Sequence, residues 1–77
     1  MDKADLKKLQ DKLKAKFPMR YAKMIREKSG KSYSSIYKTF DERDPLIVME
    51  VVDAAIAILK ESIEKDQSRL NSLSELL

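Results

Sequence analysis

Three helix-breaking residues divide this chain, and they are so few that the fold must be built from helices. Gly30 is the only glycine, and Pro18 and Pro45 are the only prolines among 77 residues. Turn-rich β structure needs many such residues and helices need few, so the composition predicts an all-α protein. The last segment, residues 46–77, contains neither glycine nor proline. A helix through it would be roughly 50 Å long at about 1.5 Å per residue.

The first two segments each predict an amphipathic helix. The first helix begins at Asp2 or Asp5, and its apolar residues recur at helical spacing: Leu6, Leu9, Leu13 and Phe17. Pro18 ends this helix and suits the first turn of the second, which extends over residues 19–29. On the second helix, Ile25 and either Tyr21 or Ala22 are expected to face the core.

Gly30 separates the second helix from a third. A glycine at this point supplies the left-handed backbone position that closes a helix. Ser32 is then a favourable N-cap, because its hydroxyl accepts a hydrogen bond from a backbone N–H in the first turn. The third helix buries Ile36 and Phe40 and ends near residues 41–43. Two short helices joined by so tight a turn predict a helix-turn-helix.

The fourth helix is expected to begin with Asp44 as N-cap and Pro45 in the first helical position. Between residues 46 and 59 only Glu50 and Asp53 are charged. A helix that is apolar on nearly every side must be covered on several sides. The three preceding helices can cover one side, and a second copy of the chain is the expected cover for the other.

The same helix carries a heptad seam, which predicts a homodimer. Its apolar residues recur at intervals of four and three, as in a two-stranded coiled coil: Val52, Ile56, Leu59, Ile63, Leu70, Leu73 and Leu77. Asp66 interrupts the seam, where it either fixes the register or loosens the tail. Isoleucine at the a positions with leucine at the d positions favours a parallel two-stranded coil, but the flanking positions carry little complementary charge, so the orientation is only weakly encoded. The alternative is an amphipathic tail that folds back on its own core.

The composition excludes several kinds of catalytic and metal-binding site. Histidine and cysteine are both absent, which excludes disulfides, zinc sites and histidine-assisted catalysis. We therefore expect no enzymatic activity, no metal or other cofactor, and no small-molecule ligand. The first residues show no signal-peptide pattern, and the longest apolar run, residues 54–59, is too short to span a bilayer. These features predict a cytoplasmic protein that does not bind membranes.

The charge of the chain is unevenly distributed. Residues 1–43 contain 13 Lys/Arg and 6 Asp/Glu, a balance of +7, whereas residues 44–77 contain 3 and 7, a balance of −4. A basic half attached to an acidic half indicates that one end meets a polyanion. The simpler alternative is a lysine-rich surface that is solvated and binds no polyanion.

Residues 29–38, Ser-Gly-Lys-Ser-Tyr-Ser-Ser-Ile-Tyr-Lys, resemble the DNA-binding segment of the lac repressor family. In that family an Ala-Gly-Val-Ser-x-x-Thr-Val-Ser-Arg pattern occupies the same frame. The segment is also similar to small phage and plasmid helix-turn-helix regulators of the form Gly-Lys-Ser-x-Ser-Thr-Val-Tyr-Lys. The resemblance covers residues 20–41. The large sugar-sensing domain of the lac repressor family has no counterpart here, so no sensory function is expected.

This resemblance implies two sets of DNA contacts. The base-reading set would be Ser32, Tyr33, Ser34, Tyr37 and Lys38, whose short, aromatic and cationic side chains suit base edges. The phosphate-binding set would be Arg20, Lys23, Arg26 and Lys31. The family has a small residue at the position of Arg26, because the two helices nearly touch there. Arg26 is therefore expected either to bend outward toward a phosphate or to change the helix crossing.

These observations predict a helix-turn-helix domain over residues 1–59 and a dimerisation tail over residues 60–77. The leading functional hypothesis is a small DNA-binding transcriptional regulator, dimeric, with its third helix in the major groove of double-stranded DNA. One alternative is an assembly or adaptor module that uses the apolar long helix and keeps the helix-turn-helix as scaffold. Another is binding of RNA or a membrane surface by the lysine-rich first helix.

Overall fold

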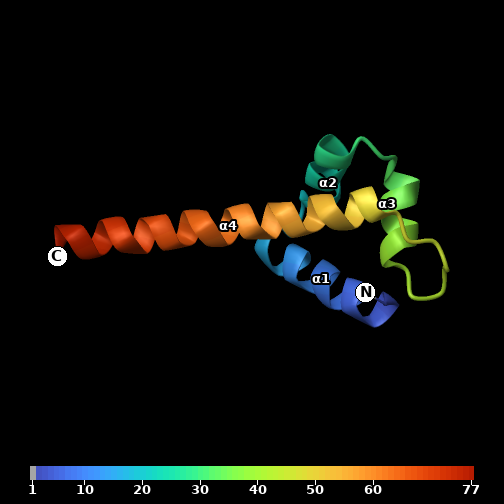
Figure 1. The fold of residues 1–77 in the computed structure, drawn as a ribbon, viewed down its shortest axis with the longest axis horizontal. Helices are drawn as coiled ribbons and strands as arrows, with labels where there is room; N and C mark the ends of the chain where they lie inside the picture. Colours follow the sequence, from blue (N-terminus) through green and yellow to red (C-terminus); the bar gives the residue numbers. More distant parts are fainter. Residues whose placement is uncertain (1) are drawn as a thin grey trace.

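The computed structural model describes residues 2–77, and within that range it contains four helices and no strand. The helices are α1 (Lys3–Lys16), α2 (Tyr21–Ser29), α3 (Tyr33–Phe40) and α4 (Met49–Leu76). The three short helices surround the first half of α4, and the rest of α4 projects alone from the bundle (Figure 1). The described chain therefore measures 50 × 23 × 20 Å. The predicted all-α architecture with a long C-terminal helix is confirmed.

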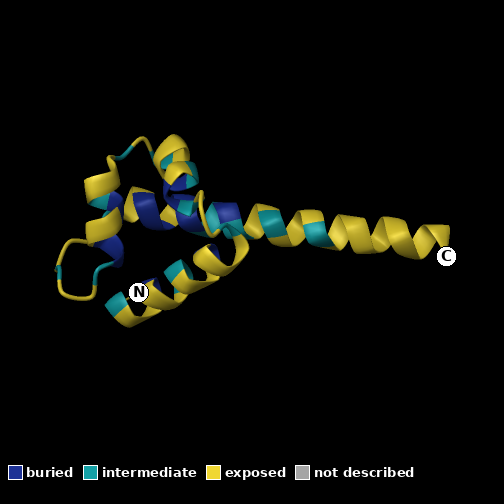
Figure 2. Ribbon diagram, turned by 180° about the vertical axis from the view of Figure 1, so that it is seen from behind, coloured by how far each residue is buried: buried dark blue, intermediate teal, exposed yellow. Residues whose placement is uncertain are grey.

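The core lies where the short helices meet the first half of α4 (Figure 2). The short helices contribute predicted residues to it: Leu6, Leu13, Ala22, Ile25, Ile36 and Phe40. The long helix adds Val51, Val52, Ala54, Ala55 and Ile58. Five buried residues within eight positions cover a wide arc of α4, and the two alanines among them leave room for neighbouring helices. Of the two inward candidates on α2, Ala22 is buried and Tyr21 is half-buried.

The predicted caps of the first three helices are largely present. Asp2 accepts a hydrogen bond from the backbone N–H of Asp5 at 3.0 Å, and the Asp5 side chain faces the Asp2 N–H in return. Gly30 has a φ of 73°, in the left-handed region, and its N–H donates to the Arg26 carbonyl at 2.9 Å. The Ser32 hydroxyl accepts from the N–H of Ser35 at 3.3 Å. The second helix begins at Tyr21, two residues later than predicted.

The predicted start of the long helix is wrong. Asp44 does not cap a helix; its carboxylate accepts from the N–H of Leu46, two residues on, at 2.9 Å. Residues 44–48 lie outside any helix, and α4 begins at Met49. The reason is that the segment is tied to the end of α3. The N–H of Val48 donates to the hydroxyl of Thr39 at 3.2 Å, and the carbonyl of Leu46 accepts from Lys3.

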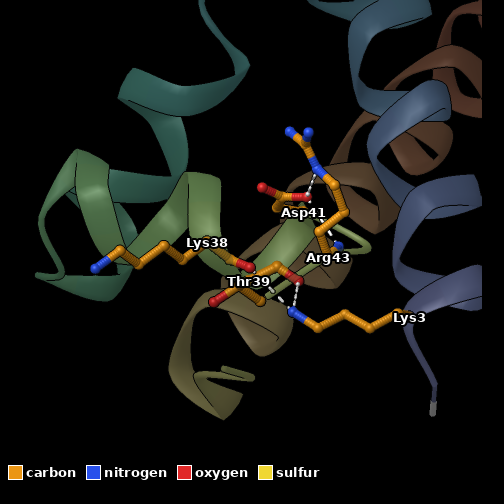
Figure 3. Close-up of polar contacts among 5 residues, drawn as sticks. All are labelled: Lys3, Lys38, Thr39, Asp41 and Arg43. Atoms are coloured by element: carbon orange, nitrogen blue, oxygen red, sulfur yellow. Dashed lines mark hydrogen bonds and ion pairs between the residues drawn. The ribbon is translucent and has the colours of Figure 1, made fainter. Parts of the chain in front are cut away.

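Lys3 and Thr39 join the end of α3 to the segment before α4. The Lys3 ammonium donates to the carbonyls of Lys38 and Thr39, at 3.0 and 2.8 Å (Figure 3). It also donates to the carbonyl of Leu46. Carbonyls in the last turn of a helix lack partners within the helix, and a cation is favoured there. The fully buried Thr39 hydroxyl also donates to the Ser35 carbonyl at 2.8 Å. The first helix thus holds the last turn of α3 in place.

Replacing Thr39 with valine is expected to destabilise the bundle by about 1–3 kcal/mol, because it leaves the N–H of Val48 without its acceptor. Urea unfolding followed by circular dichroism measures the loss. Thr39→Ser is the matched control, because it keeps the hydroxyl, and it should cost less than the valine variant. Equal losses in the two variants would show that packing, and not the hydrogen bond, holds this junction.

Candidate nucleic-acid interface

The third helix has one buried face and one exposed face. Ile36, Thr39 and Phe40 point into the core, where each is at most 3% exposed. At 100° per residue, Ser34 and Lys38 lie on the opposite side of the helix, and both are exposed. The helix is short, at eight residues, but both of its ends are held, by Ser32 at the start and by Lys3 at the end. A rigid helix therefore presents one polar face to solvent.

All five residues of the predicted base-reading set are exposed on this part of the surface: Ser32, Tyr33, Ser34, Tyr37 and Lys38. Ser34 and Lys38 form the ridge farthest from the core, and the two tyrosines lie along one side of it. The Lys38 side chain extends away from the cluster around Lys3, which uses only the Lys38 backbone carbonyl (Figure 3). Its ammonium is thus directed toward solvent.

Arg26 joins α2 to this face by stacking on an aromatic ring. Its guanidinium carbon lies 4.9 Å from the centroid of the Tyr33 ring. Tyr33 in turn stacks with Tyr37, with ring centroids 6.3 Å apart and an angle of 22° between the planes. Arg26 is exposed, which agrees with the first of the two alternatives, an outward bend. What the sequence did not predict is that the ring of Tyr33 receives the cationic head.

The remaining members of the predicted phosphate-binding set lie in two separate places. Arg20 and Lys23 are exposed and border one shallow cleft at the start of α2. Lys31 lies in the turn, where it is half-buried and its backbone N–H donates to the Ser29 hydroxyl at 3.2 Å. Arg26 stands between them along α2. The four cations therefore follow the edge of the helix-turn-helix and do not form a single cluster.

Acidic side chains limit the direction from which a polyanion can approach. Glu50 and Asp53, in the first turns of α4, border the same hollow as Lys28 and Ser29 at the end of α2. Glu61 also pairs with Lys28, at 2.9 Å. The surface between α2 and α4 is therefore poor in unpaired positive charge. This surface is therefore unfavourable for a polyanion.

Two ion pairs fasten the short helices to the middle of α4. Lys28 on α2 pairs with Glu61, and Lys16 on α1 pairs with Asp66. The hydrogen bonds from these two lysines hold the pKa of Glu61 and the pKa of Asp66 below their ordinary values of 4.5 and 3.8. Asp66 thus has an intramolecular partner, which the interrupted heptad pattern did not reveal. Both ion pairs join α4 at positions beyond residue 59.

The predicted dimerisation residues do not share one environment. Val52 is 2% exposed and belongs to the core of its own chain, so its assignment to a dimer interface is wrong. Ile56 and Leu59 are half-buried against that core. Ile63, Leu70, Leu73 and Leu77 are between 54% and 97% exposed. The same apolar spacing therefore runs through residues that pack inside their own chain and through residues that are exposed on the tail.

Comparisons with known protein families, with curated proteins and with solved structures found no match. Within residues 2–77, no helix combines the length and apolar character that crossing a membrane requires. The same residues contain no cluster of three or more acidic side chains arranged to hold a metal ion. The surface of the helix-turn-helix is therefore interpreted from its own geometry and charge.

Gly30→Ala should destabilise the protein by about 1–2 kcal/mol, because an L-residue is strained in the left-handed conformation. A Cβ at this position would meet no atom within 4 Å, so the cost comes from the backbone alone. Chemical denaturation measures it. Gly30→Asn serves as the comparison and should cost less, because asparagine tolerates this conformation better than alanine. A larger loss for asparagine would contradict the backbone explanation.

Lys16→Met should raise the pKa of Asp66 toward 3.8, because the lysine hydrogen bond is what lowers it. Since the folded-state pKa is depressed, the pair stabilises the fold above the unfolded-state pKa and is lost as pH falls through the folded-state pKa. An NMR titration of the carboxyl carbons measures the pKa. Lys28→Met is the control: it should shift Glu61 and leave Asp66 unchanged. An unaltered Asp66 pKa in Lys16→Met would contradict the pairing.

Proposed function

We propose that this chain is a small, non-catalytic protein that binds double-stranded DNA by placing α3 in the major groove. In this proposal Ser34, Tyr37 and Lys38 meet base edges, and Arg20 and Lys23 contact phosphates on the flanking backbone. In this proposal the protein is cytoplasmic and forms a dimer through α4. It would regulate transcription by occupying a DNA site or by recruiting another protein to it. No catalytic step and no cofactor are involved.

The observation that carries the proposal is the separation of the two faces of α3. The buried face anchors the helix to α1 and α4, so the exposed face can carry side chains that the fold does not need. Ser34 and Lys38 make no side-chain hydrogen bond within residues 2–77. This face belongs to the half of the chain that has a charge balance of +7. A rigid helix with a short serine and a solvent-directed lysine on its outer ridge matches the donor and acceptor pattern of a major groove.

Arg26 has a modified role in this proposal. Its guanidinium is held over Tyr33, and Tyr33 is stacked on Tyr37. The three side chains therefore form one block that positions Tyr37 next to the Ser34–Lys38 ridge. Arg26 can still reach a phosphate from this place, because the residue is exposed. It acts first as a support for the tyrosines.

A second candidate function is supported by the uncovered end of α4. Four large apolar side chains within residues 70–77 are more than half exposed: Leu70, Leu73, Leu76 and Leu77. An assembly or adaptor module would use that surface to bind a partner protein, and the basic half would then keep the protein soluble. Salt separates the two functions, because phosphate contacts weaken steeply with ionic strength and apolar contacts do not.

The decisive experiment measures binding to duplex DNA by fluorescence anisotropy at two salt concentrations, for the wild type and for Lys38→Ala. If Lys38 meets a base edge, its loss should cost about 1–3 kcal/mol and relax sequence preference at one position. Lys60→Ala is the matched control, because it removes the same charge from an exposed site on α4. It should leave the preference intact.

Two outcomes would reject the proposal. The first is the absence of duplex binding at low salt, which would favour the adaptor function. The second is binding that survives replacement of Tyr33, Ser34 and Lys38 by alanine. That result would assign the affinity to the lysines of α1 and favour RNA or an anionic surface as the ligand.

A further inference from the structure

The ring of Tyr33 is engaged by two neighbours within the protein. The guanidinium carbon of Arg26 lies 4.9 Å from its centroid. The centroid of the Tyr37 ring lies 6.3 Å from it, with an angle of 22° between the two planes. Arg26 belongs to α2, and Tyr37 stands in the next turn of α3. Side chains from two different helices therefore pack on this one ring, which leaves less of it for a ligand.

Tyr37 is the more open of the two tyrosines. It is 51% exposed, against 38% for Tyr33. It also borders a hollow of about 380 Å³, together with Lys7 on α1 and Arg43 beyond the end of α3. At about 100° per residue, Tyr37 lies about 80° from the middle of the Ser34–Lys38 ridge, and Tyr33 lies about 120° from it. The ring of Tyr37 is therefore both more exposed and nearer to the outer face of α3.

The position of Tyr37 is fixed from several sides. Its neighbour Ile36 is fully buried, and Lys3 donates to the backbone carbonyl of the residue that follows Tyr37, at 3.0 Å. The ring itself is supported by Tyr33, which Arg26 holds in turn. An aromatic side chain that is already held in place loses little conformational freedom when it binds a ligand.

The major groove offers only one apolar group to such a ring. Every base pair exposes hydrogen-bond donors or acceptors there, and thymine alone adds a 5-methyl group. Ser34 and Lys38 can form hydrogen bonds with the polar groups, but the face of an aromatic ring cannot. A ring placed against polar base edges alone would remove their water and return no hydrogen bond, which costs free energy. The exposed ring of Tyr37 therefore favours a thymine.

We propose that Tyr37 contacts the 5-methyl group of a thymine in the major groove, and that Tyr33 positions Tyr37 without touching the DNA. This assignment rests on the proposed DNA binding and adds a preference for one base to it. It also departs from the resemblance to the lac repressor family, which places Tyr33 in the base-reading set. Tyr33 is instead a positioning residue, and the apolar contact comes from the next turn of α3.

The experiment measures whether the thymine methyl group contributes to binding. The wild-type protein first selects its preferred duplex from a random-sequence library at low salt. That duplex is then synthesised with deoxyuridine in place of every thymidine, which removes the methyl groups and keeps the base pairing. Fluorescence anisotropy should show binding to the uracil duplex that is weaker by about fourfold for each methyl group the ring covers.

Three variants separate the roles of the two tyrosines. Tyr37→Ser removes the ring and should bind the thymine and uracil duplexes equally well. Tyr33→Ser removes the support and should reduce the preference for thymine. Tyr33→Phe keeps the stacked ring and loses only the hydroxyl, so it should restore the wild-type affinity and the full preference. Both rings lie at the surface, and circular dichroism of the three variants should match that of the wild type.

The possible failures are distinguishable. Equal binding of the wild type to the two duplexes would overturn the thymine contact and leave DNA binding itself intact, and this comparison needs no protein variant. A loss of affinity in Tyr33→Phe as large as that in Tyr37→Ser would show that the Tyr33 hydroxyl touches DNA, which would overturn its positioning role. Failure to select any duplex would reject the proposed function, and the thymine contact with it.

Discussion

The structure depends on one constraint, which is that the first half of α4 is too apolar to face water. Val51, Val52, Ala55 and Ile58 are at most 3% exposed because three short helices are arranged around them. Burying such side chains contributes about 1.5–3 kcal/mol each for the larger ones. No short helix here has enough apolar surface to be stable alone. Each helix forms because α4 covers its apolar face, and α4 in turn is covered by all three.

The same constraint determines where the functional surface can be. The inner face of α3 is committed to the core, and its last turn is held by Lys3. Only the outer ridge and the tyrosines beside it are available for a ligand. The Arg26–Tyr33 contact then shows how a residue that seems too large for a helix-turn-helix is accommodated. The arginine leaves the helix contact, and its charge is placed over an aromatic ring at the edge of the candidate interface.

Sequence reasoning succeeded where the signal was local. The left-handed Gly30, the Ser32 cap and the buried Ile36 follow from residue type and spacing, and all three are present. It failed where distant segments decide the structure. Asp44 and Pro45 look like a helix start, but Lys3 and Thr39 bind Leu46 and Val48 at the end of α3, and the segment stays outside the helix. The pairing of Lys16 with Asp66 joins residues fifty positions apart, and no periodic pattern marks it.

The seam shows why an apolar period alone does not identify an interface. A heptad pattern indicates that one face of a helix is covered, but it does not indicate which element or partner covers it. Here the same spacing runs through Val52, which is buried in the core of its own chain, and through Ile63 and Leu70, which are exposed. Burial within the chain accounts for the first part of the pattern, so only the exposed part calls for another explanation. The period alone therefore locates an uncovered apolar face on α4 and does not identify its partner.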